Sequence, residues 1–101
     1  MKRKIPKSFK IYATTITVDF DDKAMNEQGI LGESDYVKGR IRLAKSNKLQ
    51  DLSYDAILDT FYHEKVHMIL DTMREDGLSG NEKFVEQFSR LLRQSDETEE
   101  L

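Results

Sequence analysis

Apolar and polar residues alternate through the first half of the chain, which is typical of strands with one buried face. Ser8–Tyr12 and Thr15–Phe20 alternate in this way and are rich in β-branched and aromatic residues. Ala13-Thr14 lies between them, and we expect a tight hairpin there. Residues 23–29 break the alternation and predict a loop or a short helical turn.

A second pair of strands is predicted further along the chain. Ile30–Val37 and Arg40–Ala44 are its two segments, and Lys38-Gly39 lies at their junction. Glycine tolerates the positive φ that a tight hairpin turn requires, so we expect the chain to reverse here. Together the segments predict a small antiparallel sheet of three to four strands.

The second half of the chain has helical spacing instead. Ser53 is a good N-cap for a long helix that begins at Tyr54, and no residue interrupts that helix before Gly77. We expect Gly77 to end the helix in a left-handed conformation. From about Asn81 a second helix is predicted, because the apolar residues recur on one helical face: Phe84, Val85, Phe88, Leu91 and Leu92. The whole pattern predicts an α+β fold, with a small sheet followed by a long helix and a C-terminal helix.

Length and charge narrow the class of protein. We expect one domain over residues 1–101, with a flexible basic start at 1–7 and a flexible acidic tail at 95–101. The formal net charge of −3 argues against a dedicated nucleic-acid-binding protein. No apolar run has the length of a signal-peptide core or a membrane span. We therefore expect a monomeric cytoplasmic protein that does not contact membranes.

Both histidines of the chain lie on the predicted long helix, within His63-Glu64-Lys65-Val66-His67. Residues four apart on an α-helix differ by about 40° around its axis, so both imidazoles can reach one zinc ion. Glu64 projects at a neighbouring angle, where it can act as the general base on a zinc-activated water. Since the chain has no cysteine, any metal must be bound by His, Asp or Glu. The alternative is a pair of helix histidines without a metal.

A third ligand is expected from the next helix. Hydrolytic zinc sites use three protein ligands and leave the fourth position to water. A tight link with two glycines, Asp76–Gly80, is expected to bring the second helix back towards the first. Glu82 and Glu86 lie one turn apart just after this glycine link. We expect Glu82 to bind the metal, and Glu86 to hydrogen-bond a ligand histidine and fix its ring. The alternative is an ordinary charged pair on a solvent-exposed helix face.

The arrangement of HExxH on one helix and Asn-Glu-x-x-x-acid on the next resembles the gluzincin clan of zinc metallopeptidases. In size the chain is similar to the minigluzincins, single-domain members reduced to the catalytic core, and the resemblance covers Phe9 to Arg93. It implies a zinc-dependent metalloendopeptidase with the metal bound by His63, His67 and Glu82, and with Glu64 as general base. The later acid of the family, usually aspartate, supports a ligand histidine, and here it is Glu86.

The resemblance also implies how a peptide or protein substrate binds. In that family an edge strand before the long helix pairs with the substrate backbone, and the matching residues here are Arg40, Ile41, Arg42, Leu43 and Ala44. Some minigluzincins are latent because a terminal segment lies across the cleft. This predicts that the acidic tail Asp96–Leu101 offers a carboxylate to the zinc ion. Compact enzymes of this kind are typical of phage or bacterial genomes.

Two other functions remain open at this point. ImmA-like and SprT-like regulatory proteases also carry HExxH on a small scaffold. SprT-like proteins usually take a third histidine, which this chain lacks, whereas ImmA-like proteins use downstream acids. The second alternative is a non-catalytic interaction module that binds metal without turnover and recruits a partner peptide through an edge strand. Zinc content and a cleavage assay distinguish these functions.

Overall fold

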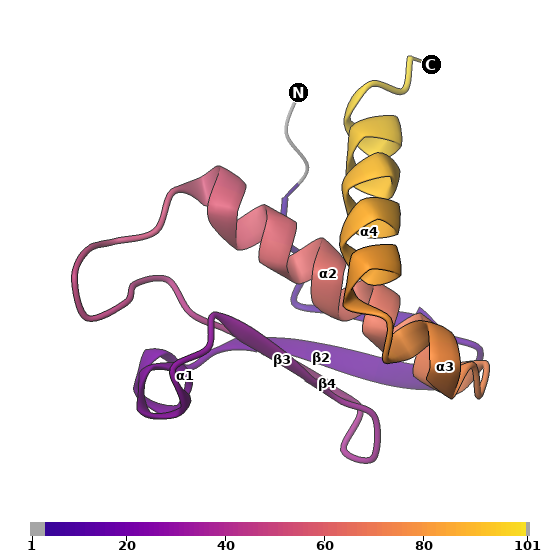
Figure 1. Ribbon diagram of the computed structural model, residues 1–101, viewed down its shortest axis with the longest axis horizontal. Coiled ribbons are helices and arrows are strands. Elements are labelled where there is room, and N and C mark those ends of the chain that lie inside the picture. The colour runs from indigo at the N-terminus through magenta and orange to yellow at the C-terminus, as the bar shows by residue number, and fades with distance from the viewer. Residues whose placement is uncertain (1–3, 101) are drawn as a thin grey trace.

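The computed structural model describes residues 4–100. Its elements in chain order are β1 (Ser8–Ile11), β2 (Thr14–Phe20), α1 (Asp22–Gln28), β3 (Gly32–Asp35), β4 (Arg40–Leu43), α2 (Tyr54–Thr72), α3 (Asp76–Ser79) and α4 (Glu82–Glu97). The helix α2 lies across one face of the sheet, and α4 crosses α2 (Figure 1). The predicted α+β class is confirmed, with the sheet preceding the two long helices.

The four strands form one mixed sheet in the order β1-β2-β4-β3. The two predicted hairpins are present, since β1 pairs with β2 and β3 pairs with β4, both antiparallel. However, β2 and β4 run parallel, so the sheet is not wholly antiparallel as predicted. The helix α1, where a loop or short helical turn was predicted, carries the chain away from β2. As a result β3 forms the far edge, and β4 returns into the space beside β2.

The strand β4 is internal, which corrects the prediction that Arg40–Ala44 forms an exposed edge. It pairs with β2 on one side and β3 on the other, so its backbone cannot receive a further strand. Ile41, Leu43 and Ala44 are buried. The alternation of Arg40–Leu43 arises because one face of the sheet is covered by α2 and the other is not. Alternation therefore reports how a strand's faces are covered, and it does not report whether its backbone is paired.

The main core lies between the sheet and α2. Its buried residues are Ile16, Val18, Ile41, Leu43, Ile57, Leu58, Phe61, Tyr62 and Met68. A second cluster joins α2 to α4 and consists of Val66, Leu70 and Val85. Because α2 is buried by the sheet on one side and by α4 on another, its rotation about its own axis is fixed. The turn that carries both histidines is held in place by these two contacts.

The end of α2 differs from the prediction. Arg74, not Gly77, takes the left-handed conformation, with φ of 62°. The N–H of Glu75 donates to the carbonyl of Leu70 at 2.9 Å, and the N–H of Arg74 donates to that of Asp71 at 3.1 Å. This pair of bonds is a Schellman motif. Gly77 lies inside α3, a four-residue helix that is too short to leave a periodic signal in the sequence.

Parts of both predicted flexible ends belong to the folded domain. Ser95 to Glu97 form the last residues of α4. Near the start of the chain, Ile5 packs against the main core, and its N–H donates to the hydroxyl of Tyr54 at 3.2 Å. Residues 1–3 and 101 lie outside the described part of the chain.

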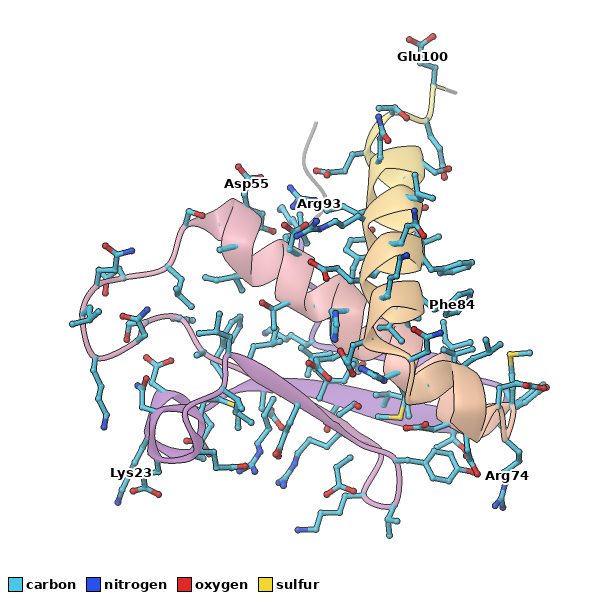
Figure 2. All side chains as sticks on the ribbon, in the orientation of Figure 1. Lys23, Asp55, Arg74, Phe84, Arg93 and Glu100 are labelled. Carbon is cyan, nitrogen blue, oxygen red and sulfur yellow. The ribbon has the colours of Figure 1, made fainter. Side chains whose placement is uncertain are left out.

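Arg93 connects α4 to the first turns of α2 through hydrogen bonds and ion pairs. Its Nη1 donates to the Asp59 carboxylate, its Nη2 to the Asp55 carboxylate and its Nε to that of Glu97, each at 2.6 Å. Figure 2 shows Arg93 reaching from α4 towards the start of α2 near Asp55. Burial alone would lower the pKa of Arg93, but the bonds to Asp59, Glu97 and Asp55 outweigh it and raise the pKa above its usual value. The Arg93 side chain is only 13% exposed.

The strand β3 approaches α2 closely because residue 32 has no side chain. A Cβ added at Gly32 would lie 2.5 Å from Cγ2 of Thr60 and 3.3 Å from Cγ of Glu64. The Thr60 hydroxyl donates to the carbonyl of Ala56 at 3.0 Å, which holds the Thr60 rotamer. The turn of α2 that carries Glu64 therefore rests directly against β3.

We predict that Gly32→Ala lowers the free energy of unfolding by about 1–3 kcal/mol, because the added methyl group overpacks the contact with Thr60. Gly77→Ala is the matched control: a Cβ there has no neighbour within 4 Å, and alanine favours the helical conformation of α3. Chemical denaturation of both variants measures the difference. Equal stability of Gly32→Ala and the parent protein would contradict the close contact.

We also predict that Arg93→Ala lowers the free energy of unfolding by about 1–3 kcal/mol, because it leaves the carboxylates of Asp55 and Asp59 without their shared partner. Arg90→Ala is the control on the same helix. Arg90 is 66% exposed and pairs with Glu86 on its own helix, so its removal should cost less than about 0.5 kcal/mol. Thermal or urea denaturation that ranks the two variants the other way would contradict the role of Arg93.

Candidate metal centre

The ligands predicted from the sequence come from the middle of α2 and the first residue of α4. His63 and His67 lie one turn apart on α2. Asn81 caps α4, because its side-chain oxygen accepts the N–H of Phe84 at 3.1 Å. The cap fixes where α4 begins, so Glu82 is its first residue, next to the link that joins it to α2.

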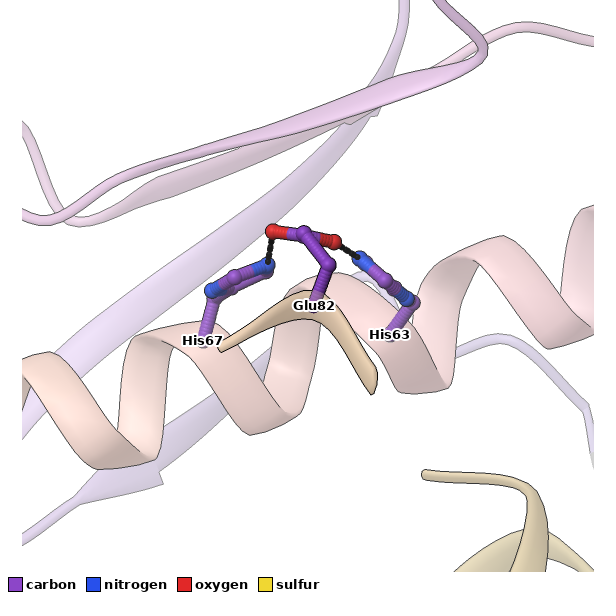
Figure 3. A group of neighbouring side chains, drawn as sticks. All are labelled: His63, His67 and Glu82. Carbon is purple, nitrogen blue, oxygen red and sulfur yellow. Dashed lines mark ion pairs between the residues drawn. The ribbon is translucent and has the colours of Figure 1, made fainter. Parts of the chain in front are cut away.

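The three side chains converge on one point. Nε2 of His63 lies 3.1 Å from Oε2 of Glu82, and Nε2 of His67 lies 3.1 Å from Oε1 of the same carboxylate (Figure 3). One ligand atom from each residue lies within 4.8 Å of the other two. Around a tetrahedral cation with bonds of about 2.0–2.1 Å, ligand atoms are roughly 3.3 Å apart. The geometry therefore fits a single divalent cation after small side-chain movements, and the predicted convergence of His63, His67 and Glu82 is confirmed.

The centre lies at the surface and is accessible from one side. The side chains of His63 and His67 are 26% and 14% exposed, whereas that of Glu82 is 67% exposed. The imidazoles are therefore held by the packing of α2, and the carboxylate approaches them from the solvent side.

Ser79 holds the ring of His67. Its Oγ lies 3.0 Å from Nδ1 of His67, and Ser79 is 8% exposed. When a cation occupies Nε2, Nδ1 carries the ring proton and the serine oxygen accepts it, which orients Nε2 towards the centre. Ser79 belongs to α3 and could not be found from the sequence, because its contact depends on a four-residue helix in a segment predicted to be a tight glycine link.

Glu86 does not take the role predicted for it. Its Oε1 accepts a bond from Nη2 of Arg90, one turn further along α4, at 2.8 Å. This is the ordinary charged pair that was the alternative for this residue, and the partner of His67 Nδ1 is Ser79 instead. Because α4 crosses α2 (Figure 1), the first residue of α4, Glu82, lies at the histidines, whereas Glu86, one turn further on, lines a cavity beside the centre and pairs with Arg90.

Glu64 lies between α2 and the edge strand β3. Its side chain is buried, with 9% of the residue exposed, and it accepts a hydrogen bond from the side chain of Ser34. The pKa of Glu64 is raised to about 7, mainly because the carboxyl group is buried. The hydrogen bond from Ser34 lowers the pKa, whereas the negative charges of Glu82 and Glu33 raise it further. A carboxyl group with such a pKa can both accept and release a proton near neutrality.

The acidic tail does not lie across the centre. Asp96 is on the last turn of α4, roughly 21 Å from Glu82 along the helix axis at about 1.5 Å per residue. Its carboxylate accepts a bond from the hydroxyl of Tyr62 at 2.8 Å. Glu100 lies beyond that end of α4 (Figure 2). The prediction of a tail carboxylate on the metal is therefore wrong for the described residues 96–100, and residue 101 lies outside them.

Comparisons of the chain with protein-family models, curated proteins and solved structures find no match in any of the three. Within residues 4–100 there is no helix with the length and apolar character needed to cross a membrane. Inferences about function therefore depend on the centre itself: two imidazoles, one carboxylate, and a buried glutamate beside them.

We predict that Ser79→Ala weakens binding of a divalent cation by about 10–100-fold, because the His67 ring loses the hydrogen bond that fixes its orientation. Ser89→Ala is the matched control: Ser89 is also buried, but its hydroxyl donates to the carbonyl of Glu86 and contacts no ligand. Competition for Zn²⁺ or Co²⁺ against a chelating dye measures both affinities. Equal affinities for the two variants would show that Ser79 does not position the ring.

Proposed function

We propose that this protein is a zinc-dependent metallopeptidase that hydrolyses peptide bonds at the centre formed by His63, His67 and Glu82. The observation that supports it most is the convergence of the two Nε2 atoms on one carboxylate, each at 3.1 Å. Two nitrogen ligands and one oxygen ligand are the set used by hydrolytic zinc sites, which keep a fourth position free for water. Zinc also binds imidazole more readily than the alkaline-earth cations do.

The catalytic step requires a base and a held substrate. Zinc at this centre would lower the pKa of a bound water to about 7 and polarise the scissile carbonyl. Glu64 takes a proton from the attacking water, whose oxygen forms a bond to the carbonyl carbon. Glu64 then gives that proton to the leaving amine as the C–N bond breaks, so the first products are a carboxylic acid and an amine. The new acid then loses its own proton to the amine or to solvent, which leaves a carboxylate. Glu64 is buried against β3 and lines the same cavity as His63, and its raised pKa suits it to both transfers.

The substrate backbone pairs with β3. This strand is an edge of the sheet, paired only with β4, and no described strand lies on its outer side. Gly32 brings β3 against the turn of α2 that carries Glu64. An extended peptide added to this edge would form main-chain hydrogen bonds that do not depend on its sequence. The role predicted for Arg40–Ala44 therefore passes to Gly32–Asp35, the neighbouring strand.

The chemical type of the third ligand distinguishes between the classes of HExxH zinc peptidase. Glu82 supplies a carboxylate, as in gluzincins and in the acid-liganded ImmA-like proteases, whereas SprT-like proteins usually take a third histidine. We therefore favour a minimal gluzincin-like peptidase. A module that binds zinc without turnover would have the same ligands, so only a cleavage assay separates a peptidase from such a module.

We predict that Glu64→Gln retains one zinc ion per chain and loses turnover by about 10²–10⁴-fold, because an amide cannot accept the proton of the attacking water. His67→Ala is the companion variant, and it should lose zinc as well as activity because it removes a ligand. Elemental analysis measures the zinc, and cleavage of casein measures the turnover.

The outcomes of this experiment separate the alternatives. Full activity in Glu64→Gln would show that Glu64 is not the base. Zinc bound by the parent protein without cleavage of any peptide would indicate the non-catalytic module. Absence of zinc in the parent protein after incubation with excess metal would remove the basis of the proposal.

A further inference from the structure

A cavity of about 290 Å³ opens directly beside the metal centre, and His63 and Glu64 form part of its wall. The cavity is separate from the cation site, because neither His67 nor Glu82 lines it. Three elements enclose it: the segment that leads into β3, the middle of α2 and the middle of α4. Its walls include Ile30, Leu31, Asp59, Glu86 and Arg90.

The cavity has an apolar wall and a polar wall. Ile30 and Leu31 form the apolar wall, immediately before the edge strand β3. Asp59 of α2 and Glu86 of α4 supply carboxylates on the other walls. Their side chains are 47% and 55% exposed, so both carboxylates remain accessible to a group that enters the cavity.

Negative charge exceeds positive charge around this cavity. Within residues 4–100, Arg90 is the one lysine or arginine that lines the cavity, and it is paired with Glu86. Behind Asp59, the guanidinium of Arg93 is shared among three carboxylates, those of Asp59, Asp55 and Glu97. Asp59, the acid of this group that lines the cavity, therefore shares its cation with two other carboxylates and is only partly neutralised. A cationic group that enters would complete the pairing.

We propose that this cavity binds a lysine or arginine side chain of the substrate next to the scissile bond, which makes the protein selective for basic peptides. The aliphatic stem of such a side chain packs on Ile30 and Leu31, and its charged end reaches Asp59 and Glu86. A peptide paired with β3 turns alternate side chains towards the α2 side of the sheet, where the cavity lies. This inference depends on the proposed function for its catalytic consequence, but side-chain binding can be tested without turnover.

The first test is the cleavage profile of a mixed peptide library, read by mass spectrometry. We expect the zinc-loaded protein to prefer lysine or arginine at one fixed position beside the scissile bond. Peptides with either residue there should be cut about 3–10-fold more often than peptides with glutamate or methionine, because partly exposed charge pairs contribute modestly to binding. Glu86→Gln should reduce this preference, and Arg90→Gln should increase it, because they change the cavity charge in opposite directions. Glu27→Gln, an exposed glutamate on α1, is the charge-matched control and should leave the profile unchanged.

The second test separates the cavity from catalysis. Zinc-loaded Glu64→Gln is titrated with two peptides that differ only at the selected position, where one has lysine and the other has glutamate. If the first test selects no position, each position is compared in turn. Fluorescence anisotropy measures the affinity of each peptide. We expect the lysine peptide to bind about 3–10-fold more tightly. Tighter binding of lysine peptides without cleavage by the parent protein would support the cavity and overturn the hydrolase. Cleavage with no preference for basic residues, or equal affinity for the two peptides, would overturn the cavity assignment.

Discussion

The metal centre depends on one crossing, that of the first turn of α4 over the histidine-bearing turn of α2. Glu82 reaches both imidazoles only if α4 begins at the right place and leaves in the right direction. Asn81 sets the beginning, the Schellman motif at Arg74 and the short helix α3 set the path between the helices, and Val85 and Arg93 hold the helices together. None of these residues is one of the three that converge, but together they decide where the Glu82 carboxylate lies.

A second constraint places Glu64, the proposed base, and the edge strand side by side. Because residue 32 is glycine, β3 lies against Thr60 and Glu64 without an intervening side chain. The same contact buries Glu64, which raises its pKa, and leaves the outer edge of β3 beside the centre. Base, edge strand and cavity are therefore consequences of a single close approach between a strand and a helix.

The helix α4 has three different roles along its length. Its first residue supplies the carboxylate of the candidate metal centre, its middle supplies the charged wall of the cavity through Glu86 and Arg90, and its last turns anchor it to α2 through Arg93 and Asp96. The anchoring residues are well shielded, whereas the cavity residues are exposed and paired within the helix. Substitutions in the cavity wall should thus alter recognition with little effect on the fold.

The sequence by itself determined the features that are local or periodic: the α+β class, both hairpins, the start of α2 at Ser53, and the spacing of His63, Glu64 and His67. It also indicated Glu82, because a cap and an acid at a helix start are read from neighbouring residues. Tertiary structure alone decided the parallel pairing of β2 with β4, the edge position of β3, the contact of Ser79 with His67 and the pairing of Glu86 with Arg90. Alternation indicates which face of a strand is covered, but not which strands lie beside it. Similarly, the sequence around a glutamate in a helix does not show which residue it pairs with. Strand order and partner choice arise only when segments distant in sequence pack against each other.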